Sequence, residues 1–112
     1  MTVKVTATSI KSDGVNFPDY NQAFEDHLTA NYVSTGKLVS KETIKTKVNE
    51  SDDDLNKREL VMVFDSAASF NEFQADPVRI EARAARDAYF AEHGITTTDT
   101  VVEYIAPDVA PA

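Results

Sequence analysis

The sequence of 112 residues contains no cysteine and only three glycines. Without cysteine the chain can form no disulfide, no zinc–thiolate site and no iron–sulfur cluster, and it has no thiolate nucleophile. The glycines, Gly14, Gly36 and Gly94, lie far apart, so a glycine-rich phosphate-binding loop is also excluded. These absences remove several large classes of enzyme from consideration.

Long apolar runs are missing as well. No stretch approaches the roughly 18 apolar residues of a membrane-spanning helix. The segment MTVKVTATSIKSDG lacks the apolar core of a secretory signal. We therefore expect no contact with a membrane and a cytoplasmic location.

Positive charge is scarce, because 11 lysines and arginines stand against 19 aspartates and glutamates, which gives a net charge of −8. A surface of this sign repels a nucleic-acid backbone, so we expect no nucleic-acid partner. The hydrophobic fraction of 42% is typical of a globular protein. We expect a single domain over residues 1–106, followed by a C-terminal tail over residues 107–112.

Two hydrophobic periodicities alternate along the chain. The alternation of β-branched and polar residues predicts strands, and it occurs over residues 2–8, 37–49, 58–65 and 95–105. Helical periodicity predicts a first helix over residues 17–35. It also predicts a short helical segment over residues 67–75, capped by Asp65 and Ser66, and a long second helix over residues 76–94.

The long second helix has clear ends and unusual faces. Asp76 and Pro77 are typical of a helix start, and His93 and Gly94 are typical of a helix end. At about 100° per residue the side chains fall on three faces: Ile80, Ala84, Ala88 and Ala91; Val78, Ala82, Ala85 and Tyr89; and Arg79, Arg83, Arg86 and Phe90. We expect the first face to pack on a sheet and the second to meet another helix, the tail or a second subunit. The arginines are expected to face water.

The second and third strands differ in character. Lysines along residues 37–49 are typical of an edge strand, and strict alternation places Leu38 and Glu42 on the same face. The third strand is apolar on both faces, with Val61 and Val63 opposite Leu60, Met62 and Phe64. A strand of this kind is usually covered on both faces.

The resulting order of elements is β-α-β-β-α-β. It predicts an α+β domain with the ferredoxin-like fold, in which a four-stranded antiparallel sheet carries both helices on one face. The first and third strands of such a sheet are central, which agrees with the doubly apolar third strand. The other sheet face would then expose Val61 and Val63, and a contiguous apolar patch on central strands indicates an interface.

The length, the βαββαβ order and the segment SAASFNEFQADP followed by a long helix resemble the dimeric α/β-barrel proteins. These include the antibiotic-biosynthesis-monooxygenase-like and stress-responsive barrel groups, and the resemblance covers about residues 2–105. It implies a homodimer whose two sheets face each other, with a small-molecule pocket between sheet and helices in each subunit. Members include cofactor-independent oxygenases, haem-binding proteins, isomerases and proteins of no assigned activity, so the fold does not fix the function.

His27 is the candidate catalytic residue. It lies close to the apolar stripe of the predicted first helix, which consists of Phe17, Tyr20, Phe24 and Leu28. A histidine in the wall of a pocket can exchange protons near neutral pH, but the same position suits a histidine that binds a backbone carbonyl at the edge of the core. The candidate ligand-binding residues are Tyr20, Phe24, Asn31 and Tyr104.

No metal site and no cofactor are predicted. The only two histidines, His27 and His93, lie far apart, and His93 is expected to interact with the helix dipole. The acidic run Asp52–Asp54 lacks the spacing of a calcium-binding loop. Glu42 could act as a base if it were buried, but a side chain on an edge strand can reach water.

Three hypotheses about function remain open. The first is a small, soluble, homodimeric α/β-barrel protein of unassigned activity that binds a small molecule between sheet and helices. The second is a cofactor-independent monooxygenase or isomerase that uses His27. The third is an interaction module that binds a different protein through the open face of its sheet.

Overall fold

The computed structural model describes residues 1–19 and 21–106. Its strands are β1 (Thr2–Ile10), β2 (Leu38–Thr46), β3 (Lys57–Phe64), β4 (Thr96–Thr97) and β5 (Val101–Ile105). Its helices are α1 (Gln22–Leu28), the π-helical turn η1 (Thr29–Val33), α2 (Ala67–Ala75) and α3 (Pro77–His93). The predicted tail over residues 107–112 and the candidate residue Tyr20 lie outside the described residues.

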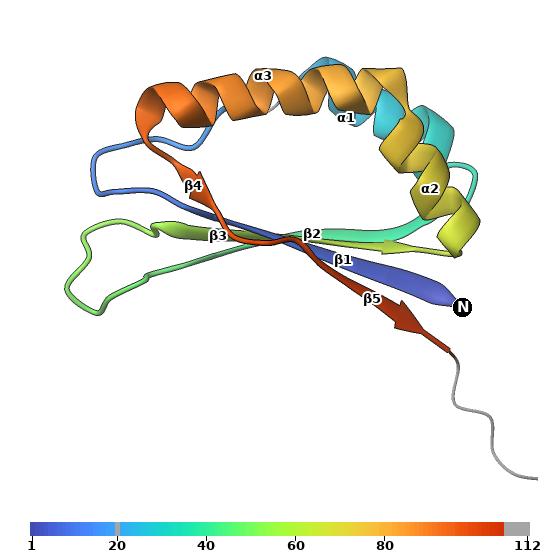
Figure 1. Cartoon of the computed structure of the whole chain (residues 1–112), viewed down its shortest axis with the longest axis horizontal. Helices are drawn as coiled ribbons and strands as arrows, with labels where there is room; N and C mark the ends of the chain where they lie inside the picture. The colour runs from blue at the N-terminus through green and yellow to red at the C-terminus, as the bar shows by residue number, and fades with distance from the viewer. Residues whose placement is uncertain (20, 107–112) are drawn as a thin grey trace, which may run out of the picture.

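The strands form one antiparallel sheet in the order β2-β3-β1-β4, and β5 pairs with β1 on the same side as β4. The helices lie together over one face of this sheet, and none of the described residues covers the opposite face (Figure 1). β1 and β3 are central, as the order of elements predicts. The prediction of a ferredoxin-like α+β fold is confirmed, with an open rather than a closed sheet.

The two faces of β3 are used as the sequence predicts. Phe64 and Met62 point toward the helices and are only 0% and 6% exposed. Val61 and Val63 alternate with them and lie on the open face, where both are half-buried.

A β-bulge at Val39 changes which side chains of β2 face the helices. Leu38 and Ser40 pair with consecutive residues of β3, so Val39 is an extra residue in the ladder. Beyond the bulge the alternation is inverted, with Lys41 on the helix side and Glu42 exposed on the open side. The prediction that Leu38 and Glu42 share one face is therefore wrong, because strict alternation takes no account of a bulge.

The last β segment is not one strand. Ser9 of β1 pairs with Thr97 of β4, whereas Thr6 pairs with Val101 of β5, so the last segment has one extra residue relative to β1. The amide of Thr98 still donates to the carbonyl of Thr8, at 3.1 Å. The prediction of a continuous strand over residues 95–105 is corrected to two short strands separated by this irregularity.

The first helix begins later than predicted. Its N-cap is Asn21, whose Oδ1 accepts a hydrogen bond from the Phe24 amide at 3.1 Å, so Phe17 and Pro18 precede the helix. After Leu28 the chain continues as η1, where the amide of Ser34 donates to the carbonyl five residues earlier. The helix is thus shorter than the predicted range of residues 17–35, because Asn21 caps the free amide of Phe24 and the helix begins only after it.

α2 and α3 begin and end as predicted. Ser66 caps α2, and its Oγ accepts a hydrogen bond from the Ser69 amide. Asp76 caps α3 through the Val78 amide, at 2.9 Å. Gly94 ends α3 in the left-handed region, with φ of 67°. These signals are local, so they are readable from the sequence.

The hydrophobic core is concentrated beneath α1, η1 and α2. Aromatic rings dominate it, and the ring of Phe73 contacts those of Phe64 and Tyr32 with centroid distances of 5.2 and 5.5 Å. The other buried members are Val3, Leu28, Leu38, Met62 and Phe70. The core therefore fills one end of the space between sheet and helices.

The rotation of α3 is opposite to the prediction. Ile80 is 51% exposed, and the alanines of its face are also exposed, so this face points to solvent. Arg79 and Arg86 are half-buried, and Arg86 lies beside Phe90, which is only 4% exposed. The sequence places Phe90 on the arginine face, and burying its large ring outweighs burying alanines. Arg79 and Arg86 consequently face inward, whereas Arg83 stays exposed.

Candidate functional site

A cleft of about 1620 Å³ opens between α3 and the sheet. The inner side of α3 forms its roof, β1 and β3 form its floor, and the segment before α1 contributes Phe17. The hydroxyl of Tyr89 donates to the carbonyl of Asn16 at 2.9 Å and thereby joins α3 to this segment. The cleft lies beside the aromatic core.

The cleft is open because α3 does not fill it. Among the residues of α3, Phe90 is the only one that is fully buried. Between the arginines, Ala82 and Ala85 line the cleft with single methyl groups. A helix with leucine at these positions would reach the sheet, whereas alanine leaves the space empty.

Three arginines lie over aromatic rings at the cleft. The guanidinium of Arg58, on β3, lies 4.5 Å from the centroid of Phe17 and 5.9 Å from that of Phe90. The guanidinium of Arg86 lies 5.2 Å from the centroid of Phe90. Arg79 lies in the same way 5.5 Å from Phe73. Stacking of this kind holds a guanidinium in place without neutralising its charge.

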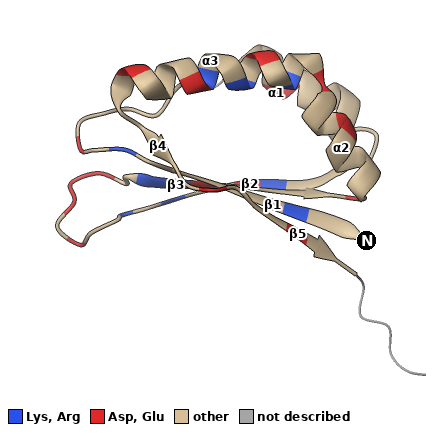
Figure 2. Cartoon of the chain, in the orientation of Figure 1, with Lys and Arg blue, Asp and Glu red and all other residues tan. Residues whose placement is uncertain are grey.

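The charges of these arginines are poorly compensated. Arg86 pairs with Asp87 at 3.0 Å, but within residues 1–19 and 21–106 neither Arg58 nor Arg79 has a carboxylate within ion-pair distance. Burial, and then the neighbouring Arg86, lower the pKa of Arg58. Burial, and then Arg83 and Arg86, lower the pKa of Arg79. Figure 2 shows positive residues on α3 and at the start of β3.

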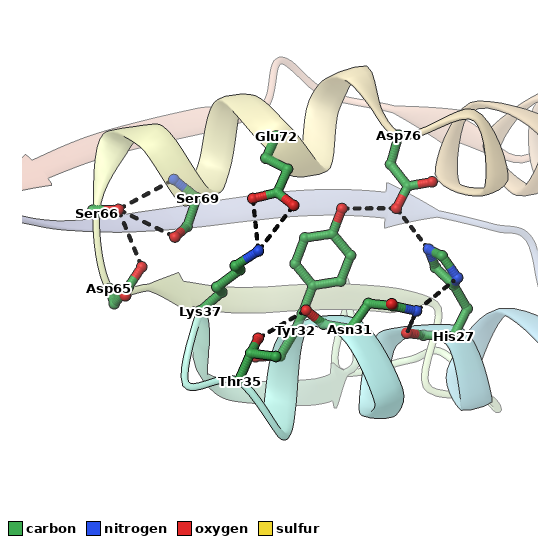
Figure 3. A network of polar contacts seen from close by, with 10 residues as sticks. All are labelled: His27, Asn31, Tyr32, Thr35, Lys37, Asp65, Ser66, Ser69, Glu72 and Asp76. Atoms are coloured by element: carbon green, nitrogen blue, oxygen red, sulfur yellow. Dashed lines mark hydrogen bonds and ion pairs between the residues drawn. The ribbon is translucent and has the colours of Figure 1, made fainter.

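A second polar cluster surrounds Asp76, at the junction of α2 and α3 (Figure 3). Asp76 Oδ2 lies 2.6 Å from His27 Nε2 and accepts a hydrogen bond from the Tyr32 hydroxyl at 2.7 Å. Asn31 Nδ2 lies 3.1 Å from His27 Nδ1 and also donates to the His27 carbonyl at 3.0 Å. Both ring nitrogens of His27 therefore have protein partners, and an Nε2–H tautomer satisfies both contacts.

The same contacts set the protonation of the cluster. Burial alone would raise the pKa of Asp76, but hydrogen bonds from His27, Tyr32 and the Val78 amide outweigh it and lower that pKa. Burial, and then the hydrogen bond to Asp76, raise the pKa of the Tyr32 hydroxyl. Asp76 is thus held as a carboxylate that fixes α1 and η1 to the start of α3.

The residues singled out in the sequence lie in different places. Phe24 lines the cleft. His27 and Asn31 belong to the Asp76 cluster and are not among the residues that line the cleft. Tyr104, on β5, is 59% exposed and also lies outside the cleft lining. The ring of His93 packs against Tyr89 with a centroid distance of 4.1 Å.

Sequence reasoning singled out His27 and Asn31 but did not assign Tyr32, Arg58 or the inward arginines of α3 to a site. Tyr32 follows Phe24 and Leu28 at helical spacing, so it could have been recognised as the buried end of that stripe. The inward arginines were signalled only by Phe90 on their face. Arg58 gave no signal, because an arginine at the start of a strand is usually exposed.

Within residues 1–19 and 21–106, no group of three or more His, Cys, Asp or Glu residues is arranged to hold a metal ion. No helix in the same residues is long and apolar enough to cross a membrane.

Comparisons with known proteins establish the fold. No protein-family model and no curated protein matches the sequence. A variant of SnoaB, a cofactor-independent oxygenase from Streptomyces nogalater, is similar in structure, with a TM-score of 0.55, 13% identity and 98% of each chain covered. A presumed antibiotic biosynthesis monooxygenase from Deinococcus radiodurans gives a TM-score of 0.52 at 8% identity, with 97% of this chain and 98% of that chain covered. A protein from Arabidopsis thaliana gives a TM-score of 0.51 at 16% identity, with 97% of this chain and 99% of that chain covered. The chain therefore shares the ferredoxin-like fold of the antibiotic-biosynthesis-monooxygenase-like proteins.

Proposed function

We propose that the protein binds a small organic molecule in the cleft between α3 and the sheet. The observation that carries this proposal is the cleft itself, an open groove whose volume of about 1620 Å³ is sufficient for a small organic molecule. Its lining combines apolar side chains such as Leu60 and Phe24 with the guanidinium groups of Arg58 and Arg79. A few polar groups on an apolar wall are typical of a ligand site.

A neutral fluorescent probe tests this proposal. N-Phenylnaphthylamine gains fluorescence when it leaves water, and we expect it to bind with one saturable site. Ala82 lines the cleft, whereas Ala84 is exposed on the outer face of α3. Ala82→Trp should therefore abolish binding and Ala84→Trp should not. Absence of saturable binding, or equal effects of the two variants, would contradict the proposal.

We further propose that two copies of the chain associate through the open faces of their sheets. Val61 and Val63 lie at the centre of this face, and Ile44, Val101 and Ile105 lie farther out on it with exposed fractions of 37%, 53% and 45%. The residues paired with the two valines are polar, so the face combines apolar and polar side chains. Apolar side chains at the centre of an uncovered sheet face support an interface between copies. Its occupation by a different protein is the alternative.

Light scattering after size exclusion separates these alternatives. We expect a dimer at micromolar concentration, and we expect Val63→Lys to produce a monomer. Ile80→Lys is the control, because Ile80 is equally apolar but lies 51% exposed on the outer face of α3. A monomeric wild type would contradict the homodimer and favour a different partner for the sheet.

Catalysis by His27 is the second candidate function. The observation that favours it is the 2.6 Å contact with Asp76, because a carboxylate that orients a histidine is typical of acid–base sites. In the Nε2–H tautomer the basic nitrogen is Nδ1, which Asn31 covers with an exposed side chain. Oxygen uptake with anthrone, which is readily deprotonated, tests a cofactor-independent oxygenase. His27→Gln should abolish oxygen uptake, and Asn31→Ala should retain it. If His27→Gln lowers the stability of the protein without changing oxygen uptake, His27 is not catalytic.

A further inference from the structure

We propose that the ligand of the cleft is an amphiphilic organic anion, whose acidic group binds between Arg58 and Arg86 and whose apolar body lies toward the core. This inference rests on the proposed function, because it assigns a chemical class to the ligand of the same cleft. Neither the net charge of the chain nor the periodicity of α3 predicts it.

The first support is convergence of the guanidinium groups from opposite walls. Arg79 and Arg86 lie seven residues apart on α3, so they lie about two turns apart on the same side of the helix. Arg58 comes from β3 below them, and both Arg58 and Arg86 lie within 6 Å of the Phe90 centroid. A group between roof and floor can therefore contact guanidinium donors from both walls.

The second support is an excess of positive charge along the cleft lining, which Asp87 beside Arg83 and Arg86 offsets only in part. Seven cationic residues line the cleft against four acidic ones, in a chain whose net charge is −8. Two of the acidic residues are already paired with lysines, Glu25 with Lys41 and Asp54 with Lys11. The cationic residues are Lys11, Lys41, Lys45, Arg58, Arg79, Arg83 and Arg86, and the acidic ones are Asp19, Glu25, Asp54 and Asp99.

The arginine geometry determines the kind of group that fits. A guanidinium binds carboxylate, sulfonate or phosphate oxygens through paired donors. Unpaired, half-buried arginines repel one another, and an anion placed among them removes this repulsion as well as forming hydrogen bonds. An oxyanion therefore gains more in this cleft than a neutral group of the same shape.

The third support is the apolar surface next to the arginines. Val5, Leu60 and Val102 pack against the edge of the core, remain only partly buried and line the cleft. A bare inorganic ion would leave this surface wet. An apolar or aromatic body attached to the anionic group would cover it, which gains roughly 25 cal/mol per Å² of apolar area buried.

A matched pair of probes tests the inference. Anilinonaphthalene sulfonate has the skeleton of N-phenylnaphthylamine with a sulfonate added, and fluorescence titration reports both. We expect the sulfonate to bind at least tenfold more tightly. Arg58→Gln and Arg86→Gln should each weaken it roughly tenfold to a hundredfold, the effect of a charged hydrogen bond, and should weaken the neutral probe much less. Lys47→Gln is the control, because it removes one exposed positive charge outside the cleft.

The outcomes separate this inference from the proposed function. Equal binding of the two probes, or arginine variants that bind the sulfonate normally, would overturn the inference. If Ala82→Trp still blocked the neutral probe, the proposed function would stand. Binding of neither probe would overturn both.

Competition distinguishes the chemical source of the anion. Displacement of the sulfonate by naphthoate alone assigns a carboxylate, and stronger displacement by naphthyl phosphate assigns a phosphate ester. Displacement by inorganic phosphate as strong as that by naphthyl phosphate would overturn the amphiphilic part of the inference and leave a simple anion site.

Discussion

Replacing Asp76, the N-cap of α3, by alanine should destabilise the protein more than replacing any carboxylate within α3. Asp76 Oδ1 accepts from the Val78 amide, and loss of such an N-cap costs about 1 kcal/mol. Asp76 Oδ2 accepts from the hydroxyl of Tyr32, a residue only 2% exposed. Leaving that hydroxyl without a partner costs about 1 to 3 kcal/mol. His27 is 23% exposed, so it can bind water instead and adds little.

The expected loss in the free energy of unfolding is therefore about 2 to 4 kcal/mol. In a domain of this size it lowers Tm by roughly 10 °C or more. Urea denaturation followed by circular dichroism measures it. Asp87→Ala is the matched control, because this carboxylate is 55% exposed and pairs with Arg86 on the surface, an interaction usually worth less than about 1 kcal/mol. The reasoning is refuted if the two variants lose equal stability, or if Tyr32→Phe leaves the effect of Asp76→Ala unchanged in a double-mutant cycle.

Three further predictions concern pH, charge and backbone conformation. The pKa of Asp76 in the folded state lies below its ordinary value of 3.8, so the stabilisation from this carboxylate is complete above pH 3.8 and is lost as the pH falls through the folded pKa. In acid, the free energy of unfolding of the wild type should therefore fall more steeply with decreasing pH than that of Asp76→Asn, as urea denaturation at several pH values would measure. Arg58→Gln should leave Tm unchanged or raise it, because it removes an unpaired half-buried charge, and a fall of several degrees would show that Arg58 has a partner. Gly94→Ala should cost about 1 kcal/mol from backbone strain alone, since φ is 67° and a Cβ meets nothing within 4 Å; a neutral result in thermal unfolding would contradict this.

Local sequence patterns predicted most of the elements of the fold. Alternation located the strands, and the caps at Ser66, Asp76 and Gly94 located the ends of α2 and α3, because each depends on residues within a few positions. The inner and outer faces of β3 followed from the same alternation. These features were readable without knowledge of the rest of the chain, and the order of the elements then determined the topology.

The candidate site depended on tertiary contacts. The bulge at Val39 inverts the faces of β2, and the rotation of α3 brings the arginines inward; neither changes the local periodicity. The pairing of Tyr32 with Asp76 joins residues 44 positions apart, and only the packing of η1 against the start of α3 brings them together. The sequence by itself determined which elements form and where they end. The tertiary structure decided which faces they turn toward one another, because burial of Phe90 competes with burial of alanines only once a sheet is present.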